Sequence, residues 1–118
     1  MKRIKPAVIK QNFMFSRVFK NGRYASGHDF VTVYALRNYN GGAPSRLGIS
    51  VSPKNGGAVQ RNRAKRVIRE AFAVLYGRIP RGYFIVIVGR KPCFDRNNKT
   101  RDVLKSMESA LAKLKLLN

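Results

Sequence analysis

The sequence predicts an α+β fold in which three helices pack against one sheet. The first observation is the helical spacing of apolar residues in three segments, residues 13–20, 59–76 and 100–114. The second is a set of segments rich in β-branched and aromatic residues, typical of strands, at residues 28–36, 46–52 and 83–89. The sequence has no internal repeat, linker or change of composition. We therefore expect a single domain over residues 1–118.

The N-terminal part of the chain is predicted to contain an arm, a short helix and a strand. Residues 1–11 are basic without a regular pattern, which indicates an irregular, flexible arm. Asn12 is in the position of a helix cap, and Asn21-Gly22 in that of a glycine stop. An additional edge strand is expected near Tyr24. Alternation in the next strand predicts two faces, one with Val31, Val33 and Ala35 and the other with Phe30, Thr32, Tyr34 and Leu36.

Two further strands and a last helix complete the pattern. In segment 46–52, alternation predicts a small polar face opposite the apolar one, formed by Gly48, Ser50 and Ser52. Segment 83–89, YFIVIVG, is apolar on both faces, which predicts a central strand covered on two sides. A helix beginning at Thr100 or Asp102 has an apolar stripe made of Val103, Leu104, Met107, Leu111 and Leu114.

The helix predicted over residues 59–76 has two different sides. Its apolar positions repeat at i, i+3, i+4, i+7, i+8 and i+11, and they are Ala64, Val67, Ile68, Ala71, Phe72 and Leu75. Its cations lie on the other side, with a flank at i, i+4 and i+8 formed by Arg61, Lys65 and Arg69. Arg66 falls between this flank and Arg63. We therefore expect one side to pack on the sheet and a continuous basic surface to face outward.

The overall charge indicates what kind of partner the chain binds. The chain has 25 Lys and Arg residues against 5 Asp and Glu residues, a net charge of +20. Such a chain repels itself, and it is expected to bind a polyanion such as nucleic acid or an anionic membrane surface. Cys93 is the single cysteine, so an intrachain disulfide is excluded and a reducing, cytoplasmic setting is expected. No segment has the length of a signal peptide or membrane span, which predicts a soluble, unexported protein.

Catalysis by the protein itself is poorly supported. The acidic residues are scattered without a close pair for two-carboxylate or two-metal chemistry, and they are Asp29, Glu70, Asp95, Asp102 and Glu108. His28 is the single histidine, and a histidine at the start of a surface strand is more often structural than catalytic. Cys93 is expected to be a semi-buried or loop thiol. We therefore expect neither catalytic residues nor a protein metal site.

The basic helix and the aromatic residues favour RNA. A solvated basic helix normally carries Glu partners at i+4, whereas here only Glu70 is present. Four arginines in the cluster favour bidentate phosphate contacts. Aromatic stripes are most often core, so Phe15, Phe19 and Tyr34 have two interpretations: core residues, or the lining of a groove for unstacked RNA bases.

These residues belong to a recognisable pattern. The segment SRLGISVSPKNGGAVQRNRAKRVIREAF, preceded by FSRVFKNG and followed by YFIVIVGRK, closely resembles the bacterial ribonuclease P protein component. The Arg61-Asn62-Arg63 block is the most specific part of the resemblance, which extends over residues 10–115 in matching order. The resemblance implies a four-stranded sheet with three helices and a left-handed βαβ crossover through the Arg61-Asn62-Arg63 helix, a fold similar to ribosomal protein S5 domain 2.

The resemblance also implies a function. Members of the family bind a catalytic RNA and help it remove the 5′ leader from precursor tRNA. The RNA performs the magnesium-dependent hydrolysis, with Mg²⁺ held mainly by RNA phosphates and no organic cofactor. By position, the implied contacts to the catalytic RNA are Lys54, Arg61, Asn62, Arg63, Lys65, Arg66, Arg69, Arg90 and Lys91. The implied cleft for the single-stranded leader consists of Phe15, Phe19 and Tyr34, in a protein that is a monomer within the holoenzyme and has no membrane partner.

Two departures and two rival functions accompany the resemblance. Pro53 stands where the family commonly has a basic residue, and Gly57 where it commonly has Asn.

A structural RNA-binding protein of the ribosome has the same size and charge, but this function leaves the aromatic cleft unexplained. A protein-only nuclease using His28 or the scattered acids is the second rival. Cleavage of precursor tRNA by the protein without RNA would distinguish it.

Overall fold

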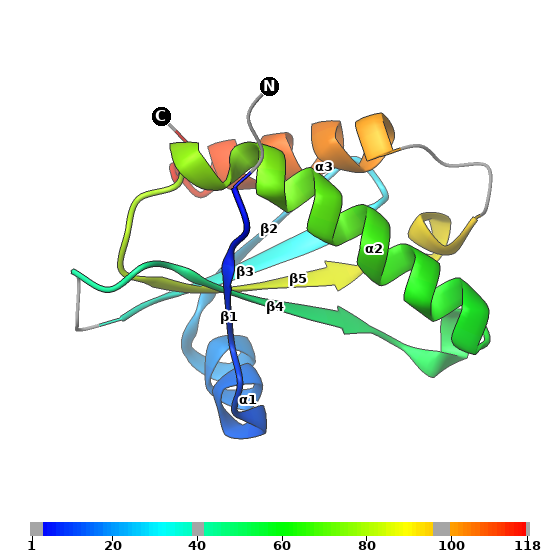
Figure 1. Ribbon diagram of the computed structural model, residues 1–118, viewed down its shortest axis with the longest axis horizontal. Helices are drawn as coiled ribbons and strands as arrows, with labels where there is room; N and C mark the ends of the chain where they lie inside the picture. Colours follow the sequence, from blue (N-terminus) through cyan, green and yellow to red (C-terminus); the bar gives the residue numbers. More distant parts are fainter. Residues whose placement is uncertain (1–3, 39–41, 96–99, 118) are drawn as a thin grey trace.

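The structure is a computed structural model that describes residues 4–38, 42–95 and 100–117. In these residues one sheet has the strand order β1-β4-β5-β3-β2, with strands β1 (Ala7–Val8), β2 (Arg23–Gly27), β3 (Val31–Arg37), β4 (Arg46–Val51) and β5 (Tyr83–Gly89). The helices are α1 (Asn12–Asn21), α2 (Ala58–Leu75) and α3 (Thr100–Lys113), and short 3₁₀ turns are η1 (Pro53–Asn55), η2 (Tyr76–Arg78) and η3 (Lys91–Phe94). The predicted α+β class and the three helices are confirmed (Figure 1).

The sheet is mixed, with β5 at its centre. Strands β4 and β5 are parallel, from the pair Arg46 and Phe84 to the pair Val51 and Gly89. Strand β3 is antiparallel to β5, and β2 is antiparallel to β3. Ile85, Val86 and Ile87 of β5 are fully buried although their side chains alternate between the two faces. The prediction of a central strand covered on both sides is therefore confirmed.

The sheet has five strands rather than the four expected, because the N-terminal arm adds one. Ala7 and Val8 pair in parallel with Arg46 and Leu47, and the Ile9 N–H donates to the Leu47 carbonyl at 2.9 Å. The prediction of an irregular arm over residues 1–11 is therefore wrong for Ala7–Val8. Two residues are too few for a periodic pattern. This strand exists because the edge of β4 supplies backbone hydrogen-bond partners to it.

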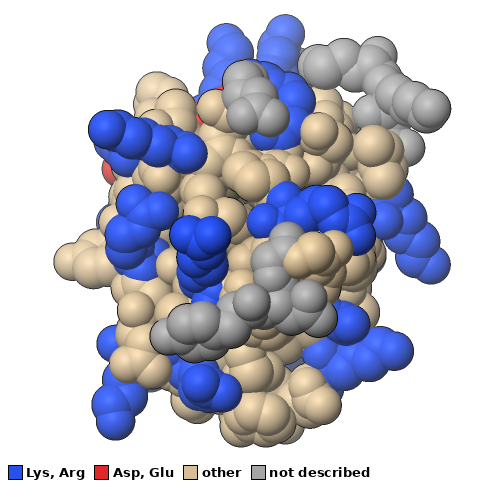
Figure 2. Space-filling view, turned by 90° about the vertical axis from the view of Figure 1, so that its left-hand side faces the viewer, with Lys and Arg blue, Asp and Glu red and all other residues tan. Residues whose placement is uncertain are grey.

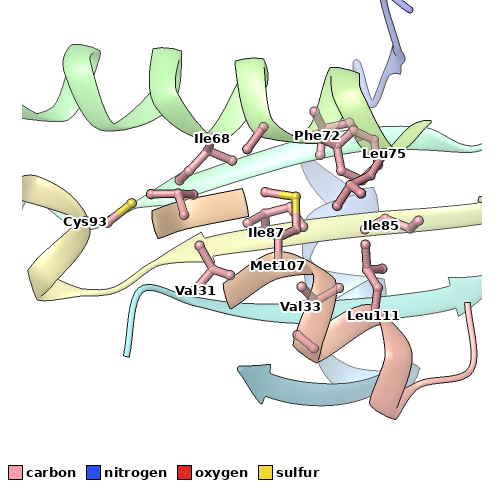
Figure 3. Packing of buried hydrophobic residues seen from close by; sticks show 14 of the residues in the cluster. Val31, Val33, Ile68, Phe72, Leu75, Ile85, Ile87, Cys93, Met107 and Leu111 are labelled. Atoms are coloured by element: carbon pink, nitrogen blue, oxygen red, sulfur yellow. The ribbon is translucent and has the colours of Figure 1, made fainter. Parts of the chain in front are cut away.

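Helices cover both faces of the sheet (Figure 1). On one face α2 and α3 pack over the main core, and Figure 3 shows Ile68, Phe72 and Leu75 of α2 directed toward β5. All six residues of the predicted apolar stripe of α2 are buried, as are Val31, Val33 and Ala35 on β3. On the opposite face α1 covers a smaller cluster of Ile9, Met14, Val18 and Val86. The predicted alternation in β3 and the core-facing side of α2 are confirmed.

Three local expectations are corrected. The cap position of α1 is Gln11, without a side-chain cap hydrogen bond, so Asn12 is not the cap. Gly22 ends this helix with an extended φ of −81°, and a Cβ there would lie 2.6 Å from the Val18 carbonyl oxygen. This glycine therefore serves close backbone approach rather than a left-handed turn. Phe30 lies in the turn before β3 and packs against the main core, so it does not share a face with Tyr34.

A buried serine joins α3 to the turn between β2 and β3. The Ser106 hydroxyl donates to the Gly27 carbonyl and accepts from the Val31 N–H at 3.3 Å. The Lys113 ammonium donates to the Ser26 carbonyl at 2.7 Å, on the same edge strand. Because Ser106 is fully buried, no water can replace its hydroxyl. This contact holds the β2–β3 hairpin against α3.

We expect Ser106→Ala to lower the free energy of unfolding by about 1–3 kcal/mol, because it removes two buried hydrogen bonds, to the Gly27 carbonyl and from the Val31 N–H. Urea denaturation at constant salt measures this change. Ser109→Ala is the matched control, since Ser109 lies on the same helix and is half-buried. Its expected effect is within about 0.5 kcal/mol. Equal losses for the two variants would contradict the role assigned to the Ser106 hydroxyl.

Candidate nucleic-acid interface

The topology gathers basic segments at one end of the sheet. Because β4 and β5 are parallel, their carboxyl ends lie at the same edge, and the helix that connects them begins there. Turn η1, which contains Lys54, follows β4, while Arg90 and turn η3 with Lys91 follow β5. All three cations are exposed. A hollow of about 460 Å³ lies between these turns and the first turn of α2, lined by Asn55, Gln60, Lys91, Pro92, Phe94 and Asp95.

The start of α2 fits the glycine at position 57, where the family commonly has Asn. The Gly57 N–H donates to the Gln60 side-chain oxygen at 2.9 Å, which satisfies one of the free backbone groups at the helix N-terminus. A Cβ at Gly57 would meet no atom within 4 Å, so the site has room for a larger residue. Pro53 begins η1, where its missing N–H is not needed. Both residues therefore fit the backbone at this end of α2.

The basic side chains of α2 divide into two groups. Arg61 donates to the Gly56 carbonyl and Arg63 to the Asp95 carbonyl, each at 3.1 Å, while Arg66 forms an ion pair with Glu70 at 3.0 Å. The side chains of Lys65 and Arg69 form no hydrogen bond or ion pair with any described residue. All five predicted cations of the helix are exposed or half-buried. Within the described part of the chain, Lys65 and Arg69, on the β4 side of the helix, are therefore the two α2 cations whose side chains have no protein acceptor.

A hollow joins this basic flank to the aromatic side of the molecule. It has a volume of about 310 Å³ and lies along the edge of β4, where Lys65 and Arg69 from α2 meet Phe15 from α1. Gly48 lets the Phe15 ring lie against the strand, because a Cβ at this position would lie 2.6 Å from Cζ of Phe15 and displace the ring. The remaining lining is mostly apolar and includes Val8 and Ile49. The predicted small face of β4 therefore makes room for an aromatic ring and an adjoining cavity.

Three aromatic rings lie together on the α1 side of the sheet. The centroids of Phe19 and Tyr34 are 4.9 Å apart with an edge-to-face geometry, and Tyr24 stacks on Tyr34 at 5.4 Å with a 30° interplanar angle. We call Phe19, Tyr34 and Tyr24 the aromatic trio. Phe15 is not part of it, since its ring lies against Gly48 instead. Sequence reasoning placed an edge strand near Tyr24 but missed this ring contact, which depends on the β2–β3 register pairing Tyr24 with Tyr34.

Beyond the aromatic trio, the same face of the sheet has three hydroxyl side chains. The next cross-strand row consists of Ser50, Val88, Thr32 and Ser26, all half-buried. The hydroxyls of Ser26 and Thr32 are 2.8 Å apart, so each retains further hydrogen-bonding capacity. A row of three hydroxyl side chains and one valine therefore lies next to the rings.

Cys93 and His28, two residues considered for catalysis, lie in different environments, one buried and the other exposed. Cys93 is buried, and burial raises the pKa of its thiol from the ordinary 9.0 to about 11, an effect that the nearby Arg63 charge partly opposes. The thiol is therefore protonated at neutral pH. His28 is exposed in the turn between β2 and β3, with a positive φ of 47°, rather than at a strand start. In the described residues no group of three or more His, Cys, Asp or Glu side chains could hold a metal ion.

The comparisons with known proteins decide the family. The family model for ribonuclease P matches residues 4–115. The chain belongs to the ribonuclease P protein family. A ribonuclease P protein component from Staphylococcus epidermidis is 41% identical over 110 residues, covering 93% of this chain and 91% of the relative. One from Clostridium beijerinckii is 35% identical over 115 residues, covering 93% and 90% of the two chains.

Solved structures agree with this assignment. The ribonuclease P protein of Staphylococcus aureus is 36% identical and superposes with a TM-score of 0.79, covering 97% of this chain and all of the other. The Thermotoga maritima protein is 31% identical with a TM-score of 0.74, covering 86% and 91%. The chain is thus a protein subunit of ribonuclease P, an endoribonuclease, and as such works with ribonuclease P RNA. This result rejects the rival function of a ribosomal structural protein.

One further structural finding concerns membranes. Across the described ranges, no helix is both long enough and apolar enough to cross a bilayer.

The buried thiol predicts a pH dependence of stability. The pKa of Cys93 is about 11 in the folded state and 9.0 ordinarily, so the unfolded chain loses this proton first. The contribution of the protonated Cys93 thiol to the unfolding free energy is fully present below pH 9 and is lost as the pH rises toward 11. Between pH 8 and pH 10 we expect the unfolding free energy of the parent, relative to that of Cys93→Ala, to fall by about 1.4 kcal/mol. Denaturant unfolding of both proteins measures this difference, and parallel pH profiles would contradict it.

Proposed function

We propose that this ribonuclease P subunit binds the catalytic RNA through the basic side of α2 and holds the 5′ leader of precursor tRNA on the α1 side of the sheet. The observation that carries the proposal is the hollow at the β4 edge. There, two cations of α2 and the ring of Phe15 share one cavity. Cations suit RNA phosphates, and rings suit unpaired bases. A single-stranded segment passing this edge can contact both kinds of side chain.

The proposed contacts to the catalytic RNA are those at the carboxyl end of the sheet and along α2. They are Lys54, Arg61, Asn62, Arg63, Lys65, Arg66, Arg69, Arg90 and Lys91. Their exposure or partial exposure supports this role, as does the scarcity of acidic partners on α2, where Glu70 is the single acid. Arg63 and Arg66 would exchange an internal acceptor for a phosphate. Lys65 and Arg69 can bind phosphate without losing a contact to the described residues.

The proposed leader cleft consists of Phe15, Phe19 and Tyr34. Phe15 and Tyr34 pack against the buried cluster that contains Val18 and Val86, and Phe19 contacts the ring of Tyr34. Phe19 is 40% exposed and can accept a stacked base without unfolding its surroundings. The half-buried hydroxyl row beyond the rings offers donors and acceptors to the sugar and base edges. The leader would then be read mainly by shape and stacking, which tolerates different sequences.

The chemistry in this proposal belongs to the RNA. Mg²⁺ held mainly by RNA phosphates would activate the nucleophile, and the protein would reduce repulsion between two polyanions and position the leader. We further propose that the chain acts in the cytoplasm as one RNA-binding domain and as a monomer in the holoenzyme. The single sheet that carries both hydrophobic clusters supports the one-domain organisation.

We also propose that the β4–α2–β5 crossover is left-handed, in a fold like that of ribosomal protein S5 domain 2. In Figure 1, β4 lies in front of β5, both arrows point to the right and α2 lies above them, which supports this handedness. The usual crossover is right-handed. The unusual sense would place the outer flank of α2 above the edge of β4, where Lys65 and Arg69 line the hollow.

Salt dependence tests the α2 contact. We expect Arg69→Ala to weaken binding to the catalytic RNA and to lower the slope of log K against log salt by about one, the value for one lost phosphate contact. Filter binding at several salt concentrations measures the slope. Lys105→Ala on α3 is the matched control because it removes the same charge from another exposed helix position. Equal changes for the two variants would show that only net charge matters.

Substrate discrimination tests the leader cleft. We expect Phe19→Ala to weaken binding of precursor tRNA to the holoenzyme by about five- to tenfold, since one base loses its stacking partner. Binding of mature tRNA, which has no leader, should stay unchanged. Competition binding with both tRNAs measures the ratio. A loss of equal size for precursor and mature tRNA would contradict the cleft assignment.

A further inference from the structure

Tyr24 is the most exposed member of the aromatic trio. It is 68% exposed, whereas Phe19 is 40% exposed and Tyr34 is half-buried. Tyr34 lies against one side of the Tyr24 ring, at 5.4 Å between centroids. Because so much of the residue is accessible, the other side of the ring faces solvent. Tyr24 is on edge strand β2, so no further strand among the described residues covers it.

We propose that the outer side of the Tyr24 ring binds one unpaired RNA base and extends the leader cleft by one stacking position. This inference rests on the proposed function of the cleft. The rings of Phe19, Tyr34 and Tyr24 come from α1, β3 and β2, so together they cross the α1 side of the sheet toward its edge. A base on Tyr24 would lie one ring farther along the same surface. The partner class is single-stranded RNA, because every base has a face that can stack.

The charges around Tyr24 favour a nucleotide over an apolar peptide. Helix α1 and strands β2 and β3 contain no acidic residue in their bounds, and their cations are Arg17, Lys20, Arg23 and Arg37. A phosphate attached to the stacked base therefore meets an uncompensated positive field. The phenol oxygen of Tyr24 adds a hydrogen-bond donor at the rim of the ring.

A structural role for Tyr24 is the competing explanation. Aromatic cross-strand pairs stabilise antiparallel sheets, and Tyr24 is directly paired with Tyr34. However, Tyr34 already has Phe19 against its ring in an edge-to-face contact. A ring that served only to cover Tyr34 would not need to leave 68% of its own surface in solvent. The two roles differ in what they predict for the bound leader.

The test uses the reconstituted holoenzyme and precursor tRNAs with 2-aminopurine at successive leader positions. Stacking on a ring quenches the fluorescence of this base. For the parent we expect quenching at one position that Tyr24→Thr removes and Tyr24→Phe retains. Threonine suits a strand, so this variant removes the ring while keeping β-propensity. Affinity for precursor tRNA should fall about five- to tenfold in Tyr24→Thr, with no change for mature tRNA.

Controls separate this inference from the proposed function. Phe13→Ala removes another exposed ring, 57% accessible on α1, and should leave the quenching pattern unchanged. If Phe19→Ala alters the pattern and Tyr24→Thr does not, the Tyr24 site is wrong and the cleft stands. If neither variant alters leader binding, both proposals are overturned. If Tyr24→Thr lowers the unfolding free energy but leaves every leader position quenched, the residue is structural and the inference fails.

Discussion

The parallel pairing of β4 and β5 is the constraint on which the rest of the structure depends. Parallel neighbours require a crossover, and in this chain the crossover is the basic helix α2. Its apolar stripe buries Ile68 and Phe72 against the sheet, so its cations must face outward. The carboxyl ends of both strands then lie beside the N-terminus of α2, together with η1 and η3. One topological requirement thus places the core-facing side of α2 and the basic surface.

Charge alone does not orient an RNA on this molecule. Figure 2 shows Lys and Arg side chains spread over the left-hand end of the view in Figure 1, with hardly any Asp or Glu visible there. The positive field of a +20 chain therefore attracts RNA from several directions and supplies affinity. The orientation of a bound RNA has to come from surface features with a defined shape. The hollow at the β4 edge and the aromatic trio are such features, since each is formed by side chains from more than one element.

An element of this structure could be predicted from the sequence when its pattern of apolar residues was long. The apolar stripe of α2 extends over about three turns from Ala64 to Leu75, and all six of its predicted positions are buried. The two-residue strand β1 has no pattern, because it depends on the edge of a distant strand. Phe30 was assigned to the wrong face because β3 begins at Val31, three residues later than predicted, and Phe30 lies in the preceding turn and packs against the main core.

The candidate site was predictable in composition and less so in geometry. Family resemblance and helical spacing identified its cations, but the partners of Arg61 and Arg63 are carbonyls of irregular segments that no periodicity describes. Tyr24 was missed because its significance depends on the register that pairs it with Tyr34. Register between strands is a tertiary property, set by turns and by packing on both faces. The hollow beside Gly48 depends in the same way on the docking of α1.

The central claim is that the protein positions RNA and does not perform the hydrolysis. Reconstitution tests it most directly: precursor tRNA is incubated with purified protein alone, with the RNA subunit alone, and with both, at a fixed Mg²⁺ concentration. We expect no cleavage by the protein alone, and a higher kcat/KM for precursor tRNA when the protein is added to the RNA. Leader removal by the protein in the absence of RNA would contradict this claim.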